Sequence, residues 1–260
     1  MKLLSHLPLF RRLAVLLAAA LGAGFATRAA AAPAPDPSFF QHCVFVCVDV
    51  QEPGPRHHMK PEEMPKEWVR FGFTVEDVNA AVDYAYDVAY PNSRRVADGC
   101  RKLGLPMVFI HWGCRFRDGM DLDPVIRQSF LAQHGADYAK WGHHLTDPGS
   151  RPAELLGVRE GEYVLPKTGQ DGFNSSNLPF VLTNLGAKNI VFIGGHTGAC
   201  LGKTAASAKR LGYRILVVED ATFDARETGR LRCLAETGYD YTVTTEQFLK
   251  LVEAAKTRSP

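Results

Sequence analysis

Three residues that lie far apart in the sequence, Cys200, Asp49 and Lys167, could together carry out nucleophilic hydrolysis. A thiol supplies the nucleophile, a carboxylate accepts and returns a proton, and a lysine supplies a positive charge. Each of the three is predicted to lie at or just beyond the end of a strand. The carboxyl ends of the strands in a doubly wound parallel sheet open on one edge, so the three side chains could converge there.

Cys200 is predicted to lie in the first turn of a helix. Residues 189–195 form a β-branched apolar run that ends in two glycines, which is typical of a strand buried on both faces. Thr197 can cap the helix that follows, and Gly212 marks its end. The backbone N–H groups of a first turn have no intrahelical partner and the helix dipole is positive there. We therefore expect a stabilised thiolate and a place to hold an oxyanion.

Two other interpretations of this stretch compete with the nucleophile. A lone cysteine on a helix is often a small core residue. The strand, the glycines and Gly202-Lys203-Thr204 also imitate the end of a phosphate-binding loop. That loop requires a glycine five residues before Gly202, where this sequence has Thr197, so the sequence disfavours nucleotide binding.

Asp49 and Lys167 also have ordinary structural interpretations. Asp49 closes an apolar run over residues 43–50 and could cap the turn that follows it. Lys167 ends a short strand predicted over 162–166 and could be a solvated strand end. Neither residue is persuasive alone, but both end strands that would lead to the same edge of the sheet as Cys200.

Strands and helices alternate along most of the chain. This alternation predicts an α/β fold, with a doubly wound, mostly parallel six-stranded sheet and helices on both faces. Residues 52–73 hold four prolines and predict a long surface loop of the kind that serves as a lid. Residues 113–160 predict a partly helical cap. The other predicted strands cover 106–112, 213–218 and 239–244, and the other predicted helices cover 74–89, 93–103, 178–185, 226–237 and 246–256.

The N-terminal 32 residues differ in composition from the rest of the chain. Lys2, Arg11 and Arg12 precede an uncharged stretch over 13–26 and an alanine-rich segment, which predicts a secretory signal peptide over 1–32 and a single domain over 33–260. The apolar run is too short to predict a permanent membrane anchor. We therefore expect a periplasmic or secreted protein.

Residues 1–32 hold four of the 30 basic residues and no acidic ones, so the net charge of the remaining chain is −2. This charge balance indicates no nucleic-acid surface.

The cysteines and histidines predict neither a metal site nor a particular disulfide. Six cysteines are compatible with disulfides in an exported protein, but Cys43 and Cys47, about 13 Å apart on one strand, could not pair with each other. The adjacent pairs His57-His58 and His143-His144 point in different directions and lack metal-ligand spacing. We therefore expect no cofactor and no metal.

Three separated motifs in this order resemble those of the isochorismatase-like cysteine hydrolases over about residues 42–250. The first motif is VFVCVDVQ, which contains Asp49. The second is KTGQDGFNSSNL, which matches the family pattern at Lys167, Phe173, Ser176 and Leu178. The third is IVFIGGHTGACLGKTAASAKRLGYRILVVEDA, with its glycine turn and the threonine three residues before Cys200.

The resemblance implies a three-layer α/β sandwich with Asp49, Lys167 and Cys200 as the catalytic triad. It also implies a cis peptide bond between Gly195 and His196, with the N–H groups of His196 and Cys200 forming the oxyanion hole. The family's habit implies a symmetric homo-oligomer. Candidate substrate-binding residues are Gln51, Trp112, Phe173 and His196.

The function that this resemblance implies is metal-independent hydrolysis of a C–N bond in a small amide, carbamoyl or ureido compound, through a thioester. One alternative is a catalytically idle binding scaffold with the same fold. Another is a metal-assisted nicotinamidase, which the stretch VFIHWGCRFRDG disfavours because it lacks that subgroup's Asp and His spacing. Vinyl-ether cleavage is disfavoured because the family members that catalyse it lack the cysteine.

Overall fold

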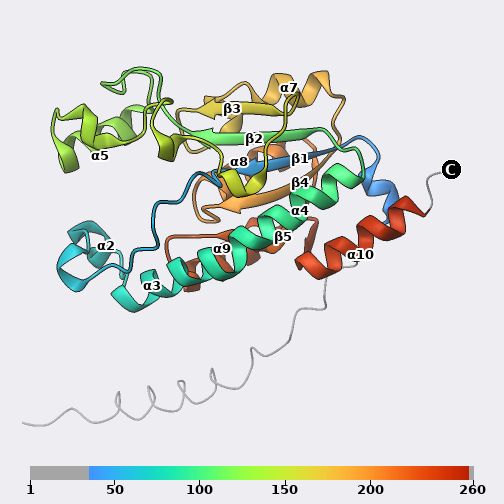
Figure 1. Ribbon diagram of the computed structural model, residues 1–260, viewed down its shortest axis with the longest axis horizontal. Coiled ribbons are helices and arrows are strands. Elements are labelled where there is room, and N and C mark those ends of the chain that lie inside the picture. Colours follow the sequence, from blue (N-terminus) through green and yellow to red (C-terminus); the bar gives the residue numbers. More distant parts are fainter. Residues whose placement is uncertain (1–34, 258–260) are drawn as a thin grey trace, which may run out of the picture. The chain divides into compact units, whose positions relative to one another are not determined.

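The computed structural model describes residues 35–257, which contain a single six-stranded sheet. Its strand order is β3-β2-β1-β4-β5-β6 and every neighbouring pair is parallel (Figure 1), which confirms the predicted doubly wound fold. The chain runs from β1 to one edge and returns to β4, so the strand order reverses between β1 and β4. The strands are β1 (Cys43–Val48), β2 (Met107–Trp112), β3 (Tyr163–Lys167), β4 (Asn189–Gly195), β5 (Arg214–Phe223) and β6 (Tyr241–Val243).

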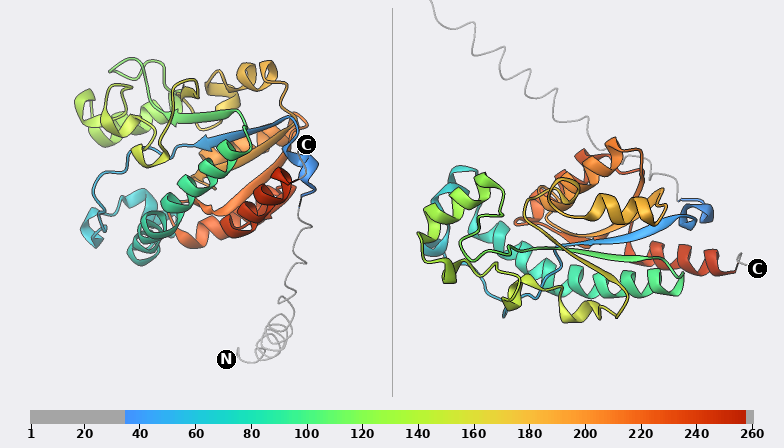
Figure 2. Two further views of the ribbon diagram at one scale, coloured as in Figure 1. Left: turned by 45° about the vertical axis from the view of Figure 1, so that its right-hand side comes forward. Right: turned by 90° about the horizontal axis from the view of Figure 1, so that it is seen from above.

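Helices cover both faces of this sheet and make the predicted three layers (Figure 2). One face packs against α4 and α10, and the other packs against α6, α7 and α8. The α-helices are α2 (Lys66–Arg70), α3 (Val75–Tyr84), α4 (Tyr90–Lys102), α5 (Pro124–His134), α6 (Gly172–Ser175), α7 (Leu178–Asn184), α8 (Cys200–Arg210), α9 (Glu227–Thr237) and α10 (Thr245–Lys256).

The central strand β1 is apolar on both sides because it is buried between two cores. Phe45 and Cys47 point into the core under α4 and α10, whereas Val44 and Val46 point into the core under α8. A strand that is buried on both faces reads as a continuous apolar run, and this run made the strand recognisable in the sequence.

The sequence had predicted two separate helices, over 74–89 and 93–103. In the structure, Pro91 does not separate them. A π-helical segment (Ala85–Ala89) joins α3 to α4, and the N–H of Tyr90 donates to the carbonyl of Ala85. Pro91 then falls in the first turn of α4, where its missing N–H is tolerated. The wider π turn absorbs the break in the α-helical hydrogen-bond pattern, so one continuous helical run results.

Strand β5 is longer than predicted because it contains a bulge. Its pairing with β4 passes from Phe192 opposite Val217 to Gly194 opposite Thr222, so β5 advances five residues while β4 advances two. Acidic residues in the bulge interrupt the apolar pattern, and the predicted strand therefore stopped at Val218. The bulge extends β5 to Phe223, which brings the next residue, Asp224, to the same edge as the end of β4.

Two segments project at the carboxyl edge of the sheet. The predicted loop over 52–73 contains the short helix α2, and the predicted cap over 113–160 contains α5 together with three short 3₁₀ turns (Figure 1). Within residues 35–257, no helix combines the length and the apolar character that a membrane crossing requires. The predicted signal peptide over 1–32 lies outside the described residues.

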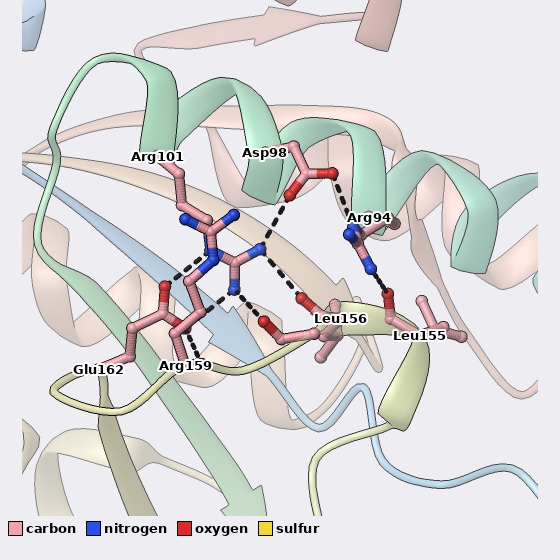
Figure 3. A network of polar contacts seen from close by, with 8 residues as sticks. Arg94, Asp98, Arg101, Leu155, Leu156, Arg159 and Glu162 are labelled. Atoms are coloured by element: carbon pink, nitrogen blue, oxygen red, sulfur yellow. Dashed lines mark hydrogen bonds and ion pairs between the residues drawn. The ribbon is translucent and has the colours of Figure 1, made fainter.

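An ion-pair network anchors the segment that leads into β3 (Figure 3). Arg101 of α4 donates from Nε and Nη2 to the two carboxylate oxygens of Glu162, over 2.7 and 2.9 Å. The same guanidinium donates to the carbonyls of Leu156 and Gly157, over 3.0 and 3.1 Å, and to the Asp98 carboxylate over 3.0 Å. The Arg101 side chain is 6% exposed and that of Glu162 is 11% exposed. This network fixes the start of the strand that ends in Lys167.

We predict that Arg101→Ala lowers the free energy of unfolding by about 3 kcal/mol, because it leaves the Glu162 carboxylate buried without its partner. The measurement is urea unfolding followed by circular dichroism. The control is Arg94→Ala, which removes an i,i+4 pair to Asp98 from a side chain that is 47% exposed. We expect that change to cost about 1 kcal/mol or less. Equal losses for the two variants would contradict the structural role of the buried pair.

Candidate active site at the carboxyl edge of the sheet

The backbone conformation of Asp49 ends β1 and turns its carboxylate out of the strand. Asp49 has φ 52°, in the left-handed region that aspartate tolerates better than most residues. Its N–H still donates to the carbonyl of Ile110 over 2.9 Å, so the turn remains attached to β2. The carboxylate therefore lies at the point where the strand order reverses, where open α/β sheets bind ligands.

Lys167 reaches Asp49 from two strands away. Its Nζ lies 2.8 Å from Asp49 Oδ2, and the lysine side chain is completely buried. On the way it passes over the ring of Trp112 at the end of β2, with Nζ 5.2 Å from the ring centroid. Nζ also donates to the carbonyl of Gly169 over 3.2 Å. Burial lowers the pKa of Lys167, but the charge and hydrogen bonds of Asp49 and Cys200 outweigh it and leave the pKa raised, so the ammonium form persists.

Cys200 is the first residue of α8, in the first turn as predicted, and its thiol lies close enough to Asp49 and Lys167 for both residues to shift its pKa. The expected stabilisation of the thiolate is wrong for the free protein. Burial, and then the negative charge of Asp49, raise the pKa of Cys200 to about 12, against the pull of Lys167. The resting site therefore holds a neutral thiol beside a Lys167–Asp49 ion pair. Asp49 Oδ1 is buried without a hydrogen-bond partner among residues 35–257, so it is free to accept a proton.

The loop between β4 and α8 presents two backbone N–H groups beside the thiol. The Gly195–His196 peptide bond is cis. The carbonyl of His196 accepts from the N–H groups of Ala199 and Leu201, over 3.0 and 3.1 Å, which folds the loop back on itself. In the part of the chain that the structure describes, no acceptor receives the N–H of His196 or of Cys200. These two donors could hold an oxyanion.

Thr197 does not cap α8, contrary to the sequence prediction. The residue at the N-cap position is Ala199, whose side chain makes no capping bond. The Thr197 hydroxyl instead donates to Asp224 Oδ2 over 2.6 Å. This contact links the loop to the end of β5, an element that the local sequence around Thr197 does not reveal.

Two of the four candidate substrate-binding residues make structural contacts. The Gln51 amide bridges the N–H and carbonyl of Trp112 and the carbonyl of Gly149, over 2.8 to 2.9 Å. Phe173 is buried in the core under α8, where its ring packs against that of Tyr213. The other two candidates lie closer to the catalytic candidates. Trp112 lies against Lys167, and His196 is half-exposed in the loop before Cys200.

Two polar residues beside the site were not singled out by the sequence. His111 of β2 follows the residue that pairs with Val48, so it lies next to Asp49, and burial lowers its pKa. Asp224 contacts the loop between β4 and α8, just before Cys200. The predicted strand β5 ended at Val218. If it had been extended to Phe223, Asp224 would have been recognised as a carboxylate at the carboxyl edge of the sheet.

A polar cleft of about 540 Å³ opens beside the loop that follows Lys167. Its walls come from the residues after β3, from the start of α5 and from Lys203, which lies one turn after Cys200. Within residues 35–257, no group of three His, Cys, Asp or Glu side chains is arranged to hold a metal ion. All six cysteines are free, including Cys200.

The fold and the site together define a doubly wound α/β protein with a cysteine, an aspartate and a lysine at its switch point. The Isochorismatase domain model matches residues 45–247, so the chain belongs to the isochorismatase family. The cysteine hydrolase of Pseudomonas syringae pv. phaseolicola has the same fold, with a TM-score of 0.62 and 16% identity over 87% of this chain and 98% of that one. The N-carbamoylsarcosine amidase of Thermoplasma acidophilum is similar with a TM-score of 0.52 and 24% identity, over 78% of this chain and 96% of that one.

Curated relatives match over shorter stretches. The ureidoacrylate amidohydrolase RutB of Agrobacterium fabrum is 37% identical over 155 residues, covering 50% of this chain and 60% of that protein. The RutB of Klebsiella pneumoniae is 32% identical over 102 residues, covering 39% of this chain. The match thus spans only 38% of the length of the Klebsiella enzyme.

We predict that Cys200 titrates far above neutral pH in the free protein. Asp49→Asn should lower the pKa of Cys200 because it removes a negative charge, and Lys167→Met should raise it because it removes a positive one. The measurement is the rate of iodoacetamide alkylation of Cys200 as a function of pH, followed by mass spectrometry. Fast alkylation of the wild-type thiol near pH 7 would contradict the neutral resting state.

Proposed function

We propose that this protein is a metal-independent cysteine amidohydrolase that cleaves a C–N bond in a small amide, carbamoyl or ureido compound. The observation that carries the proposal is the buried Lys167–Asp49 pair, 2.8 Å from Nζ to Oδ2, with the Cys200 thiol close enough to both residues for each to shift its pKa. A nucleophile, a proton acceptor and a cation in one partly buried site are the components of covalent hydrolysis.

Acylation begins with a proton transfer, because the resting thiol is neutral. Asp49 accepts the proton of Cys200 while the sulfur attacks the carbonyl carbon of the substrate. Lys167 pairs with the Asp49 carboxylate before this step and stabilises the negative charge that develops on sulfur. The N–H groups of His196 and Cys200 hold the oxyanion of the tetrahedral intermediate. Asp49 then donates its proton to the departing nitrogen, and the amine leaves.

Deacylation uses the same carboxylate in the opposite direction. The Asp49 carboxylate accepts a proton from a water molecule as the water attacks the thioester carbon, and the same two N–H groups hold the second oxyanion. Collapse of this intermediate breaks the C–S bond. The proton on Asp49 returns to the sulfur, which releases the acid and restores the thiol beside the ion pair.

The names of the relatives support this substrate class but do not identify the substrate of this protein. Two proteins among those that resemble this chain are called ureidoacrylate amidohydrolase and N-carbamoylsarcosine amidase. Both names describe hydrolysis at a C–N bond of a ureido or carbamoyl group. A small ureido or carbamoyl compound is therefore the first substrate to test.

We predict that the protein releases ammonia or amine from members of a panel of small amides, carbamoyl and ureido compounds, and that a chelator does not reduce the rate. Cys200→Ala should lower kcat by about 10⁴-fold or more, as loss of a nucleophile does in other hydrolases. The control Cys100→Ala removes a thiol from α4, on the other face of the sheet, and should keep the rate. Loss of turnover with the chelator would favour the metal-assisted alternative, and no turnover on any compound would favour an idle scaffold.

We propose in addition that residues 1–32 direct export. When the full chain is expressed in a bacterium and the cells are fractionated, we expect the protein in the periplasm or medium. Mass spectrometry should find it shortened near Ala30–Ala32, because small residues at this position are typical of signal cleavage sites. A chain that begins at residue 33 should stay in the cytoplasm. A full-length chain that remains uncleaved in the cytoplasm would contradict export.

A further inference from the structure

Asp224 binds the loop that carries both candidate oxyanion donors. Its Oδ2 accepts from the Thr197 hydroxyl and from the N–H of Gly198, each over 2.6 Å. Its Oδ1 accepts from the N–H of Ala225 over 2.7 Å and lies 3.9 Å from Nδ1 of His196. The Asp224 side chain is 12% exposed, whereas Gly198 lies at the surface. One carboxylate thus connects the end of β5 to three successive residues of the loop.

The residue before Asp224 holds the same loop. The carbonyl of Phe223 accepts from the N–H of Thr197 over 3.1 Å. The Phe223 ring packs edge-on against the His196 imidazole, with the centroids 5.5 Å apart. The end of β5 therefore fixes the loop through its backbone as well as through Asp224. The bulge in β5 makes this possible, because it carries the strand far enough to reach the loop.

Helix α8 confines the loop from the other side. A Cβ on Gly202 would lie 2.1 Å from the carbonyl oxygen of Thr197. The loop can therefore pack directly against the backbone of α8 only because this residue is glycine. Thr197 is thus buried between the end of β5 and α8. The two candidate oxyanion donors, the N–H groups of His196 and Cys200, flank the segment 197–199 directly.

The positions of these N–H groups should determine the rate. Donors to an oxyanion act when they lie about 2.7 to 3.1 Å from the place where the negative charge develops, and a displacement of about 1 Å can lower a rate by about 10²-fold. Asp224 contacts neither the thiol nor the Lys167–Asp49 pair in any bond that the structure contains. Its influence on the reaction would pass through Thr197 and Gly198.

We propose that Asp224 is a positioning residue that holds the oxyanion hole in its active geometry through Thr197 and Gly198; this inference rests on the proposed amidohydrolase function. The required property of Asp224 is an acceptor oxygen at a fixed place. Asparagine keeps such an oxygen without the charge, whereas alanine keeps neither. The two substitutions therefore separate positioning from a purely electrostatic role.

The test compares kcat and KM for an amide that the wild-type protein hydrolyses. Asp224→Ala should lower kcat by about 10²-fold with KM changed by less than about threefold, because the donors matter mainly in the transition state. Asp224→Asn should restore kcat to within about tenfold of wild type. Thr197→Val, which removes one donor to Asp224 at nearly constant volume, should fall between these two variants.

The matched control is Asp240→Ala. Asp240 also accepts a backbone N–H, that of Ile215, over 2.8 Å, but it does so at the opposite edge of the sheet, near the start of β5. This variant should keep kcat, and the thermal unfolding midpoints of all variants show whether each one folds. Equal losses of kcat in Asp224→Ala and Asp240→Ala would assign the effect to general destabilisation and overturn the inference.

Two further results would also overturn it. Wild-type kcat in Asp224→Ala would mean that the loop keeps its geometry without the carboxylate. Asp224→Asn as slow as Asp224→Ala would mean that charge is required and not position. These outcomes differ from a failure of the proposed function, in which the wild-type protein hydrolyses no compound of the panel and both proposals fall.

Discussion

The buried ion pair between Asp49 and Lys167 is the interaction on which the rest of the site depends. A buried lysine is costly unless a carboxylate lies close to it, and a buried carboxylate is costly for the same reason. The pair is held by three strands at once: β1 delivers Asp49, β3 delivers Lys167, and β2 supplies the Trp112 ring over which the lysine ammonium lies. Any shift in the register of these strands would leave an uncompensated charge, so the sheet and the site constrain each other.

The same pair explains why the thiol rests in its neutral form. Lys167 is already engaged by Asp49, so its charge does not offset the burial of Cys200 and the nearby carboxylate. A neutral thiol next to a carboxylate with one unpartnered oxygen favours a concerted proton transfer over a preformed thiolate. In the proposed mechanism the start of α8 contributes mainly through its backbone N–H groups. Of the two roles of a helix N-terminus, lowering a thiol pKa and binding an oxyanion, the proposal uses only the second.

Much of the fold could be predicted because its signals are local. Apolar runs marked β1, β2 and β4, glycines and capping residues marked helix ends, and alternation of the two indicated a doubly wound sheet. The errors arose where tertiary packing overrides a local rule. A π turn accommodates Pro91 within a continuous helical run. The bulge in β5 places acidic residues inside a strand, where they interrupt the apolar pattern. Thr197 resembles a cap but bonds to Asp224.

The sequence by itself determined that Asp49 and Lys167 stand at strand ends, because a polar residue that closes an apolar run is recognisable from local pattern. It also placed Cys200 in the first turn of α8, although Thr197 does not cap that helix. Only the tertiary structure decided the distance between Nζ and the carboxylate, the raised pKa of the thiol, and the contact of Asp224 with the nucleophile loop. These properties depend on burial and on interactions between residues up to 151 positions apart in the chain, as for Asp49 and Cys200. Local pattern cannot encode them, because desolvation and Coulomb energies are set by the surroundings of a group in three dimensions.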